Sequence, residues 1–355
     1  MSRCLLFFAL IAAWQPVYSQ ENALDILNGK FLYEEYAGCA SCHGMDGNGQ
    51  VEDLGFEDPL PDFTDCSFTT REPRKDWRDV IKQGGPARGL SESMPAYGEA
   101  ISDQQVEALI DYIKTFCSEP GWPPGDLNFR RPLVTGKAFP ENEAVLNTSY
   151  ANDENETSVT KFVYERRLGK RTQWEVAVPF IAELNASETG FGDVELSLKH
   201  VLWDHLPSAS ILSGGLEVVT PTGETGIGIG SGTWKVAPFF AAAKGFGSFF
   251  IQTNLKYEAA LEGDERELLL NLAFTQALTK EKKGAFPMLE VNAIQAWPSE
   301  KATIMLTPQI YFAFVKRGHV ALSVGSQIPV TNERPFDYRI MTFLLWEYVD
   351  GGLWW

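Results

Sequence analysis

The sequence predicts a chain of two domains: a small all-α domain in its first third, followed by an all-β antiparallel membrane barrel of about twelve strands. Three observations predict this division. Apolar residues recur at helical spacing on both sides of a Cys-x-x-Cys-His motif. Pro and Gly become dense after residue 118. Beyond that break, segments of alternating apolar and polar residues follow one another as far as Tyr348.

The N-terminal segment predicts export. Arg3 precedes an apolar run from Leu5 to Trp14, and the small polar Ser19 follows it. This run is shorter than the ~20 residues of a spanning helix. We therefore expect a signal peptide over residues 1–20, cleaved near Ser19 or Gln20, rather than a membrane anchor.

The motif that organises the first domain, residues 21–118, is the segment from Cys39 to His43. Two thiols separated by two residues can each add to one vinyl group of a haem, and the adjoining imidazole then becomes an iron ligand. A bare Cys-x-x-Cys pair also fits a redox pair or half of a zinc site. The adjoining His43 and the export signal favour one covalent haem c, attached through Cys39 and Cys42 with His43 as proximal ligand.

Two helices are expected around this site. Apolar residues recur at helical spacing within residues 23–37, where Gly29 costs about 1 kcal/mol relative to Ala and therefore needs a packing reason. A second helix is predicted over residues 102–116, opened by a capping box of Ser102 and Gln105. Both helices have an apolar face to bury.

The sixth iron ligand is expected from the loop between these helices, which contains Met94, Pro95 and Gly98. A thioether opposite the imidazole of His43 suits electron transfer rather than oxygen activation. A buried core methionine is the alternative for Met94. Met45 is a rival ligand, but it follows His43 by only two residues and is too close to reach the opposite haem face.

The span from Leu27 to Cys117 resembles the class I cytochromes c. The resemblance rests on the final aromatic helix together with Gly29, Cys39, Cys42, His43 and Met94. It implies that Gly29 lets the first helix cross closely over the last. It also implies that a proline carbonyl accepts a hydrogen bond from the proximal His43, with Pro61 preferred over Pro59. Arg88 and Trp77 are candidates for contact with a haem propionate, or else surface residues.

Two further cysteines remain in the exported chain, Cys66 and Cys117. In an oxidising compartment a disulfide between them is expected, and two buried free thiols are the alternative.

The second domain, residues 141–355, is predicted from strand periodicity, after a Pro-rich extended linker over residues 119–140. From Asp193 to Lys199 apolar and polar residues alternate strictly. Aromatic residues near strand ends and the terminal Trp355 favour a membrane barrel over a soluble β-sandwich.

The barrel resembles the outer-membrane barrels grouped with the phenol-degradation pathway family. The resemblance rests on Gly192–Leu196, Val219–Gly223, Gly230–Trp234 and Gly247. It implies a fold more directly than an activity.

The turns between the predicted strands differ in charge. Basic turns include Gly169–Arg171, Lys280–Lys283 and Lys316–Gly318, whereas turns such as Asp153–Glu156 and Glu262–Glu267 are acidic. If the first long strand rises from the periplasm, the basic turns face inward. The alternative is that hairpin turns are simply polar.

A haem domain joined to a barrel predicts single-electron transfer at the outer membrane, with the haem domain in the periplasm and with periplasmic redox proteins or an extracellular donor or acceptor as partners. The architecture is similar to cytochrome–porin fusions that oxidise extracellular iron. We expect an electron carrier rather than a catalyst with its own substrate. The alternatives are a channel for small apolar or aromatic compounds with an accessory cytochrome domain, and a soluble sandwich that binds a partner.

The charge distribution limits the partners. A net charge of −17 argues against nucleic acid. An acidic fringe beside the motif, Asp46, Glu52, Asp53, Glu57 and Asp58, is either solvated charge or an attraction for a cationic donor.

Overall fold

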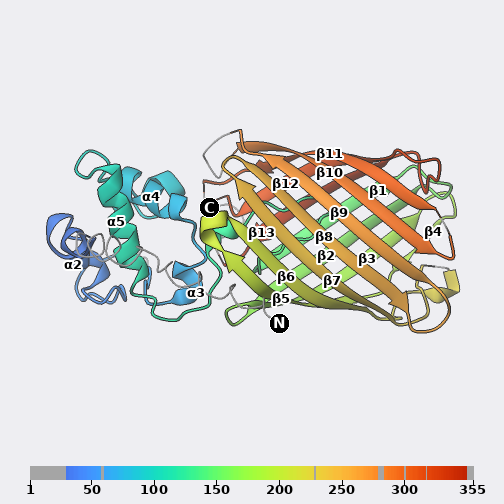
Figure 1. Cartoon of the computed structure of the whole chain (residues 1–355), viewed down its shortest axis with the longest axis horizontal. Coiled ribbons are helices and arrows are strands. Elements are labelled where there is room, and N and C mark those ends of the chain that lie inside the picture. The colour runs from blue at the N-terminus through green and yellow to red at the C-terminus, as the bar shows by residue number, and fades with distance from the viewer. Residues whose placement is uncertain are drawn as a thin grey trace, which may run out of the picture.

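The computed structural model describes residues 29–56, 60–227, 229–278, 284–299, 301–316 and 318–349, so the predicted signal peptide lies outside the described residues. A small helical domain and a barrel follow one another along the longest axis of the molecule (Figure 1). Among the described residues, no helix combines the length and the apolar character that crossing a membrane would require.

The helical domain consists of short elements joined by loops. They are η1 (Leu32–Tyr36), α2 (Ala40–His43), α3 (Cys66–Thr69), α4 (Arg74–Gln83), η2 (Gly85–Arg88) and α5 (Asp103–Lys114), followed by η3 (Gly125–Leu127). Helix α5 begins with the predicted capping box, in which the amides of Ser102 and Gln105 donate to each other's side chains at 2.9 and 3.3 Å. The apolar face of α5 packs with η1 and α4 in one core.

Gly29 marks a close crossing between the first helical segment and α5. A Cβ at Gly29 would lie 2.2 Å from the carbonyl oxygen of Ala108 and 2.7 Å from the Cβ of Tyr112. No side chain fits at that distance, so the expected packing reason for Gly29 is confirmed. The part of this predicted helix before Gly29 lies outside the described residues.

The expected disulfide is also confirmed. Cys66 of α3 and Cys117, just after α5, are bonded, with their Cα atoms 5.0 Å apart. The bond closes a loop of 51 residues and thereby ties α3, in the middle of the helical domain, to the segment after α5.

The second body is a closed antiparallel barrel. Its strands are β1 (Glu143–Ala151), β2 (Thr157–Leu168), β3 (Thr172–Glu183), β4 (Glu188–Phe191), β5 (Glu195–His205), β6 (Ser210–Val219), β7 (Lys235–Phe246), β8 (Phe249–Ala260), β9 (Arg266–Gln276), β10 (Gly284–Trp297), β11 (Ala302–Ala313), β12 (Val320–Pro329) and β13 (Arg339–Glu347). Strand β3 pairs with β2, β2 with β1, and β1 with β13, which closes the sheet. The short β4 and β5 both pair with β3 and form one interrupted strand. The wall therefore has twelve strands, as predicted, and is not a sandwich.

Alternate side chains along each strand face opposite sides of this wall. On β5, Leu196, Leu198 and Leu202 are exposed on the outside, whereas Lys199 and Val201 point inward and are buried. An apolar outer surface on a closed antiparallel barrel is the arrangement by which strands cross an outer membrane without unpaired backbone groups.

One loop anchor explains most of the residues on which the barrel resemblance rests. The carboxylate of Asp193, in the break between β4 and β5, accepts bonds from the amides of Gly223 and Ser231, each at 2.8 Å. A Cβ at Gly223 would lie 2.8 Å from the Cα of Gly230, so the loop folds closely on itself. These residues fasten the long β6–β7 loop to the end of the barrel wall.

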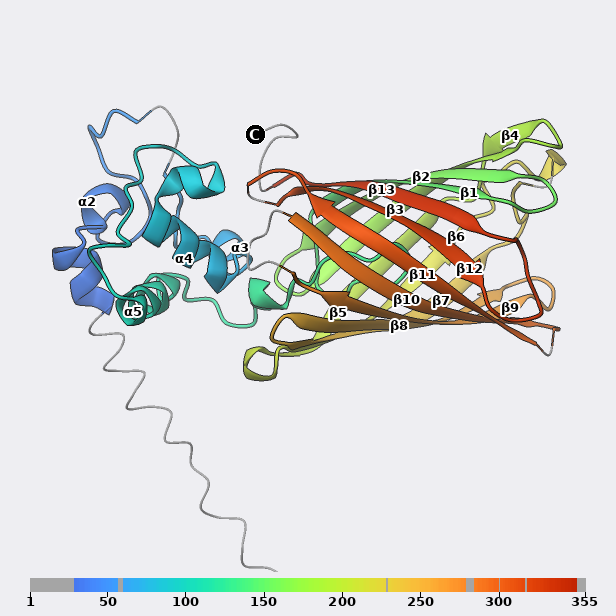
Figure 2. The same cartoon turned by 90° about the horizontal axis from the view of Figure 1, so that it is seen from above.

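The predicted linker continues into the barrel lumen, which the sequence did not indicate (Figure 2). We name residues 128–142 the plug. Inward-facing side chains of the wall hold its backbone by hydrogen bonds. The side chain of Gln309 accepts from the amide of Leu133 at 3.1 Å, and the carboxylate of Glu290 accepts from the amides of Val134 and Thr135 at 3.0 and 2.6 Å.

The opposite part of the barrel wall holds the returning half of the plug. Lys199 donates to the carbonyls of Lys137 and Phe139, both at 2.9 Å, and Ser213 donates to the carbonyl of Ala138 at 2.6 Å. Because β5, β6, β10 and β11 all contribute, the plug crosses the lumen.

Basic turns at one end of the barrel contact the helical domain. Lys316, in the β11–β12 turn, donates to the carbonyl of Pro86 in η2 at 2.7 Å, and Arg88 donates back to the carbonyl of Lys316 at 3.2 Å. In the β2–β3 turn, Lys170 and Arg171 donate to the carbonyls of Pro120 and Gly121, at the start of the linker that follows the helical domain, each at 3.1 Å. The basic turns therefore hold the helical domain against the barrel, while Lys280–Lys283 and Arg317 lie outside the described residues.

The disulfide predicts the first measurable effect. Replacing both Cys66 and Cys117 by Ala should lower the free energy of unfolding of the helical domain by about 2–4 kcal/mol, because the unfolded chain gains the freedom of the opened loop. A urea titration of the full chain in detergent, followed by proteolysis of the helical domain, measures this loss. A thiol reductant should lower the urea midpoint of unfolding of the native protein and leave that of the double variant unchanged. Equal urea midpoints for the native protein and the double variant without reductant would contradict the prediction.

The plug predicts a second effect. Glu290→Ala removes the carboxylate that accepts hydrogen bonds from three donors of Val134 and Thr135. Each hydrogen bond to a charged group contributes about 1.5–3 kcal/mol, so the variant should hold the plug less tightly. We expect liposomes with the native protein to swell slowly in small sugars and those with the variant to swell faster. Leu289→Ala, on the outer face of the same strand, is the matched control and should behave as the native protein. Equal swelling rates for all three proteins would show that the plug does not limit permeation.

Candidate haem site

One turn of helix places the motif residues. Gly38 and Gly44, both at positive φ, bound α2, and the amides of Cys42 and His43 donate to the carbonyl of Cys39 at 3.1 and 2.9 Å. Residues three and four apart lie on the same face of a helix. The spacing therefore turns both thiols and the imidazole toward one side of α2.

The two thiols are free, although the other two cysteines of the described chain are bonded to each other. Cys39 is buried, and this burial raises the pKa of its thiol to about 11. Cys42 is partly exposed. Both sulfurs remain available for covalent attachment.

His43 is buried beside an aromatic ring that the sequence reasoning did not single out. Its imidazole stacks on Phe63 with ring centres 4.7 Å apart. Burial lowers the pKa of His43 to about 4, which leaves the neutral ring that binds metals. Among the described residues, Nδ1 of His43 has no hydrogen-bond partner.

The expected bond from His43 to the carbonyl of Pro61 is therefore wrong for this structure. The carbonyl oxygens of Leu60 and Pro61 lie instead against Gly49, where a Cβ would be 3.1 and 2.9 Å from them. The loop after α2 turns these carbonyls toward its own backbone. Pro59, the other candidate, lies outside the described residues.

Met94 lies half-buried on a loop that two glycines hold in place. The amide of Gly85 donates to the carbonyl of Met94 at 3.0 Å, and a Cβ at Gly84 would lie 2.9 Å from the same oxygen. Three residues on, Tyr97 donates its amide to Ile81 at 2.9 Å and packs against the core that contains Cys39.

The side chain of Tyr97 connects this loop to the motif. Its pKa is raised first by burial and then by the nearby Cys39 and Cys42. The fold thus brings the Met94 loop to the two thiols, across more than fifty residues of sequence. Met45, the rival ligand, is 62% exposed and points to solvent.

These residues fit a c-type haem. Two free thiols, a buried imidazole with an unpartnered nitrogen and a thioether on an adjacent loop supply the donors that such a group uses. Leu32, Ile81 and Leu109 add an apolar wall in the same core as Cys39.

Arg88 and Trp77 are both buried, so the alternative that they are surface residues is wrong, and their contact with a propionate stays a prediction. Arg88 is buried, forms an ion pair with Asp76 and donates to the barrel turn at Lys316. The indole nitrogen of Trp77 donates to the carbonyl of Glu72 at 3.3 Å, and the ring packs edge-on against Phe63 at 5.4 Å. Arg88 is therefore a docking residue, and Trp77 supports the ring that stacks on His43.

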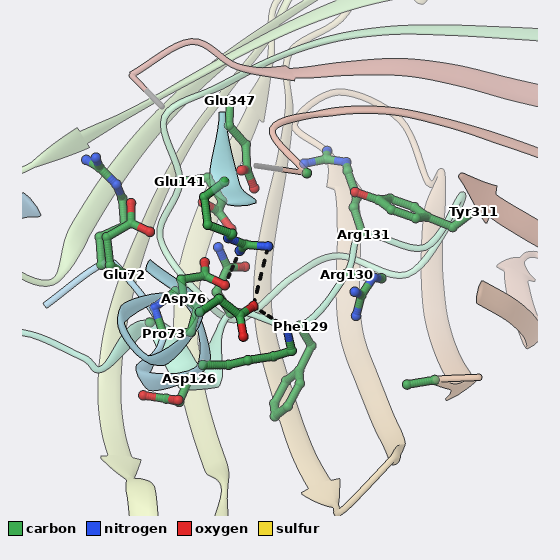
Figure 3. A pocket seen from close by; sticks show the side chains of 18 of the residues that line it. Glu72, Pro73, Asp76, Asp126, Phe129, Arg130, Arg131, Glu141, Tyr311 and Glu347 are labelled. Carbon is green, nitrogen blue, oxygen red and sulfur yellow. Dashed lines mark hydrogen bonds and ion pairs between the residues drawn. The ribbon is translucent and has the colours of Figure 1, made fainter. Parts of the chain in front are cut away.

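A cavity of about 1200 Å³ lies where the helical domain meets the barrel (Figure 3). Both bodies line it, with Asp76 from α4, Arg130 and Arg131 from the plug, and Tyr311 and Glu347 from the barrel. Its charges are largely paired within the protein.

A group of three carboxylates near this cavity, Glu141, Glu143 and Glu347, has oxygens within 4.8 Å of one another. The ammonium of Lys137 is bonded to Glu141 and lies 3.0 Å from Glu143, and Arg131 lies 3.2 Å from Glu143. The protein's own cations therefore pair with two of the three carboxylates, so this group is part of the ion-pair network that holds the plug.

Comparison with protein families assigns both bodies. Residues 25–113 match the family described as "Cytochrome C oxidase, cbb3-type, subunit III". Residues 149–336, more than half of the chain, match the family described as "Putative MetA-pathway of phenol degradation". No curated protein matches the chain significantly.

Solved structures with a similar course include an outer membrane channel from Pseudomonas putida F1, with a TM-score of 0.49 and 12% identity over 61% of this chain and 99% of that one. The KdgM porin in complex with disordered oligogalacturonate aligns with a TM-score of 0.41 and 9% identity, over 58% of this chain and 99% of that one. The NanC porin aligns with a TM-score of 0.41 and 7% identity, over 57% and 97%.

The N-terminal body is thus a cytochrome c domain, joined to an outer-membrane barrel of twelve strands. The barrel match covers more than half of the chain, and this protein therefore belongs to the family described as "Putative MetA-pathway of phenol degradation".

Proposed function

We propose that this protein carries single electrons at the outer membrane through one covalent c-type haem. In this proposal Cys39 and Cys42 hold the porphyrin, and His43 and Met94 bind the iron. The observation that carries it is the single turn of α2, which presents two free thiols and a buried imidazole on one side. When bound, the haem supplies reversible one-electron chemistry.

The chain's own residues prepare this site. Phe63 stacks on the ring of His43, and Trp77 packs behind Phe63, so the imidazole has little freedom to rotate. Gly84 and Gly85 hold the backbone of Met94 where a larger residue would clash with it. Ligands that are held in place before the iron changes its charge keep the cost of electron transfer low.

The barrel serves as an anchor in this proposal. The plug crosses the lumen, and the basic turns hold the cytochrome domain over the mouth, so both counter free diffusion through the barrel. A channel for small apolar compounds would need the plug to leave. No contact of the described residues favours that second function.

The periplasm is the proposed compartment of the cytochrome domain. The shortest turns, residues 169–171 and 247–248, lie at its end of the barrel, whereas the two longest loops, residues 220–234 and 330–338, lie at the other end. Outer-membrane barrels have short periplasmic turns and longer extracellular loops. Helix α2 lies on the side of the domain away from the barrel in both views, which supports exchange with soluble periplasmic proteins (Figures 1 and 2).

Covalent haem is the direct test of the proposed function. The pyridine haemochrome spectrum of protein purified in detergent should report one haem per chain that survives acid extraction. Replacing both Cys39 and Cys42 by Ala should abolish this covalent haem, because each thiol forms one thioether bond. Cys66→Ala with Cys117→Ala is the matched control and should retain it. Native protein without covalent porphyrin would refute the electron-transfer proposal.

The second iron ligand is tested separately. Met94→Ala should keep the covalent haem but lower the reduction potential by on the order of 0.1 V, because the thioether stabilises the ferrous iron. A redox titration followed by visible absorption measures both the haem spectrum and the reduction potential. Met45→Ala should leave potential and spectrum unchanged, and the reverse pattern in the two variants would assign the ligand to Met45.

A further inference from the structure

The cytochrome domain is strongly polarised in charge. From Lys30 to Asp65, the described residues hold seven carboxylates and a single Lys, with no Arg. The Met94 loop, residues 89–101, adds two carboxylates and no basic residue. Every segment that carries a proposed haem ligand is therefore acidic.

The basic residues of the domain lie elsewhere. Residues 71–88, which include α4 and η2, hold six Arg and Lys residues and three carboxylates. This stretch is the one nearer the barrel, and α2 is farther away (Figure 1). The acidic segment around α2 therefore faces away from the membrane anchor.

Exposed apolar side chains lie among these acidic segments. Phe31, Tyr36 and Met45 are 58%, 57% and 62% exposed. The rings of Phe31 and Tyr36 are 6.4 Å apart, and the hydroxyl of Tyr36 donates to the carbonyl of Ala100 in the Met94 loop at 3.3 Å. Met45 follows His43 by two residues, so both ends of this set adjoin the site.

Acidic residues with exposed side chains accompany this apolar set. Glu35 is next to Tyr36, Asp46 is next to Met45, and Glu52 and Asp53 follow in the same loop. We name Phe31, Tyr36 and Met45 with these four acidic residues the haem-side face. Exposed aromatic and Met side chains together with charged residues are the composition of a protein interface.

We propose that the haem-side face docks a soluble redox protein with a positively charged surface, an inference that rests on the proposed electron transfer. The partner must come close to the haem, and the opposite side of the domain is covered by the barrel through η2 and Lys316. One electron passes between partner and haem iron, one being oxidised as the other is reduced, with no bond formed or broken.

The charge selects this occupant over two others. A second copy of the chain presents the same acidic face and is repelled, and so is an anionic lipid surface. A basic protein is attracted, and an attractive field raises encounter rates by roughly tenfold or more at low ionic strength.

Two small oxidants of opposite charge test the electrostatic field at the haem-side face. The reduced full chain in detergent is mixed with tris(phenanthroline)cobalt(III), a cation, or with hexacyanoferrate(III), an anion, and the haem spectrum is followed by stopped flow. The haem-side triple variant combines Glu35→Gln, Glu52→Gln and Asp53→Asn. At low salt its haem should be oxidised about tenfold more slowly by the cation and faster by the anion than the native haem, and at high salt both differences should disappear. A matched triple variant in the far barrel loops, Glu154→Gln, Glu262→Gln and Asp264→Asn, should change neither rate.

Binding provides a readout that does not depend on electron transfer. The immobilised full chain should bind a basic soluble cytochrome c, measured by surface plasmon resonance, about tenfold more tightly than the haem-side triple variant at low salt. Tyr36→Ser with Met45→Ser should weaken binding at low and high salt alike, because it removes apolar contact rather than charge.

The outcomes separate the two proposals. If neither oxidant changes the haem spectrum of the native protein, the proposed electron transfer is refuted. If both oxidants react but the haem-side triple variant matches the native protein in rates and binding, the docking face is refuted and the electron carrier stands.

Discussion

The position of the cytochrome domain depends on a network of buried ion pairs inside the barrel. Arg131 of the plug lies between Glu143 and Glu165 of the wall, at 3.2 and 2.5 Å, and Lys137 lies 3.0 Å from Glu143. Buried charges of this kind are tolerated only when each has its partner. The segment between α5 and β1 is therefore held in the lumen, and the domain before it is held at the mouth.

This constraint separates the roles of the two sides of the cytochrome domain. The side with α4 and η2 is committed to the barrel through Arg88, Asp76 and Lys316. The side with α2 is left for the redox partner (Figure 2). Arg88, a candidate for a propionate contact from the sequence, thus joins the two domains, and the acidic loop beside the motif is part of the proposed docking face.

Patterns that are local in sequence predicted most of the fold. The strand period predicted twelve strands, because alternate side chains of a barrel wall face lipid and lumen. The capping box at Ser102 followed from helix geometry alone, and the close crossing at Gly29 followed from the resemblance to class I cytochromes c. Residues that act through distant contacts escaped prediction: Phe63 beside His43, Tyr97 beside the thiols, and the plug against Glu290. Each depends on which side chain a remote segment places opposite it.

The sequence by itself determined the two fold classes and predicted the chemistry of the site. Covalent spacing within Cys39–His43 and the two-residue strand period are properties of a short stretch of chain, so they can be read before folding. Only the tertiary structure decided that the Pro-rich linker crosses the lumen, that Arg88 joins the domains and that the carbonyl of Pro61 turns away from His43. Those outcomes depend on buried polar groups finding partners far away in sequence, and composition does not specify which partner satisfies which group.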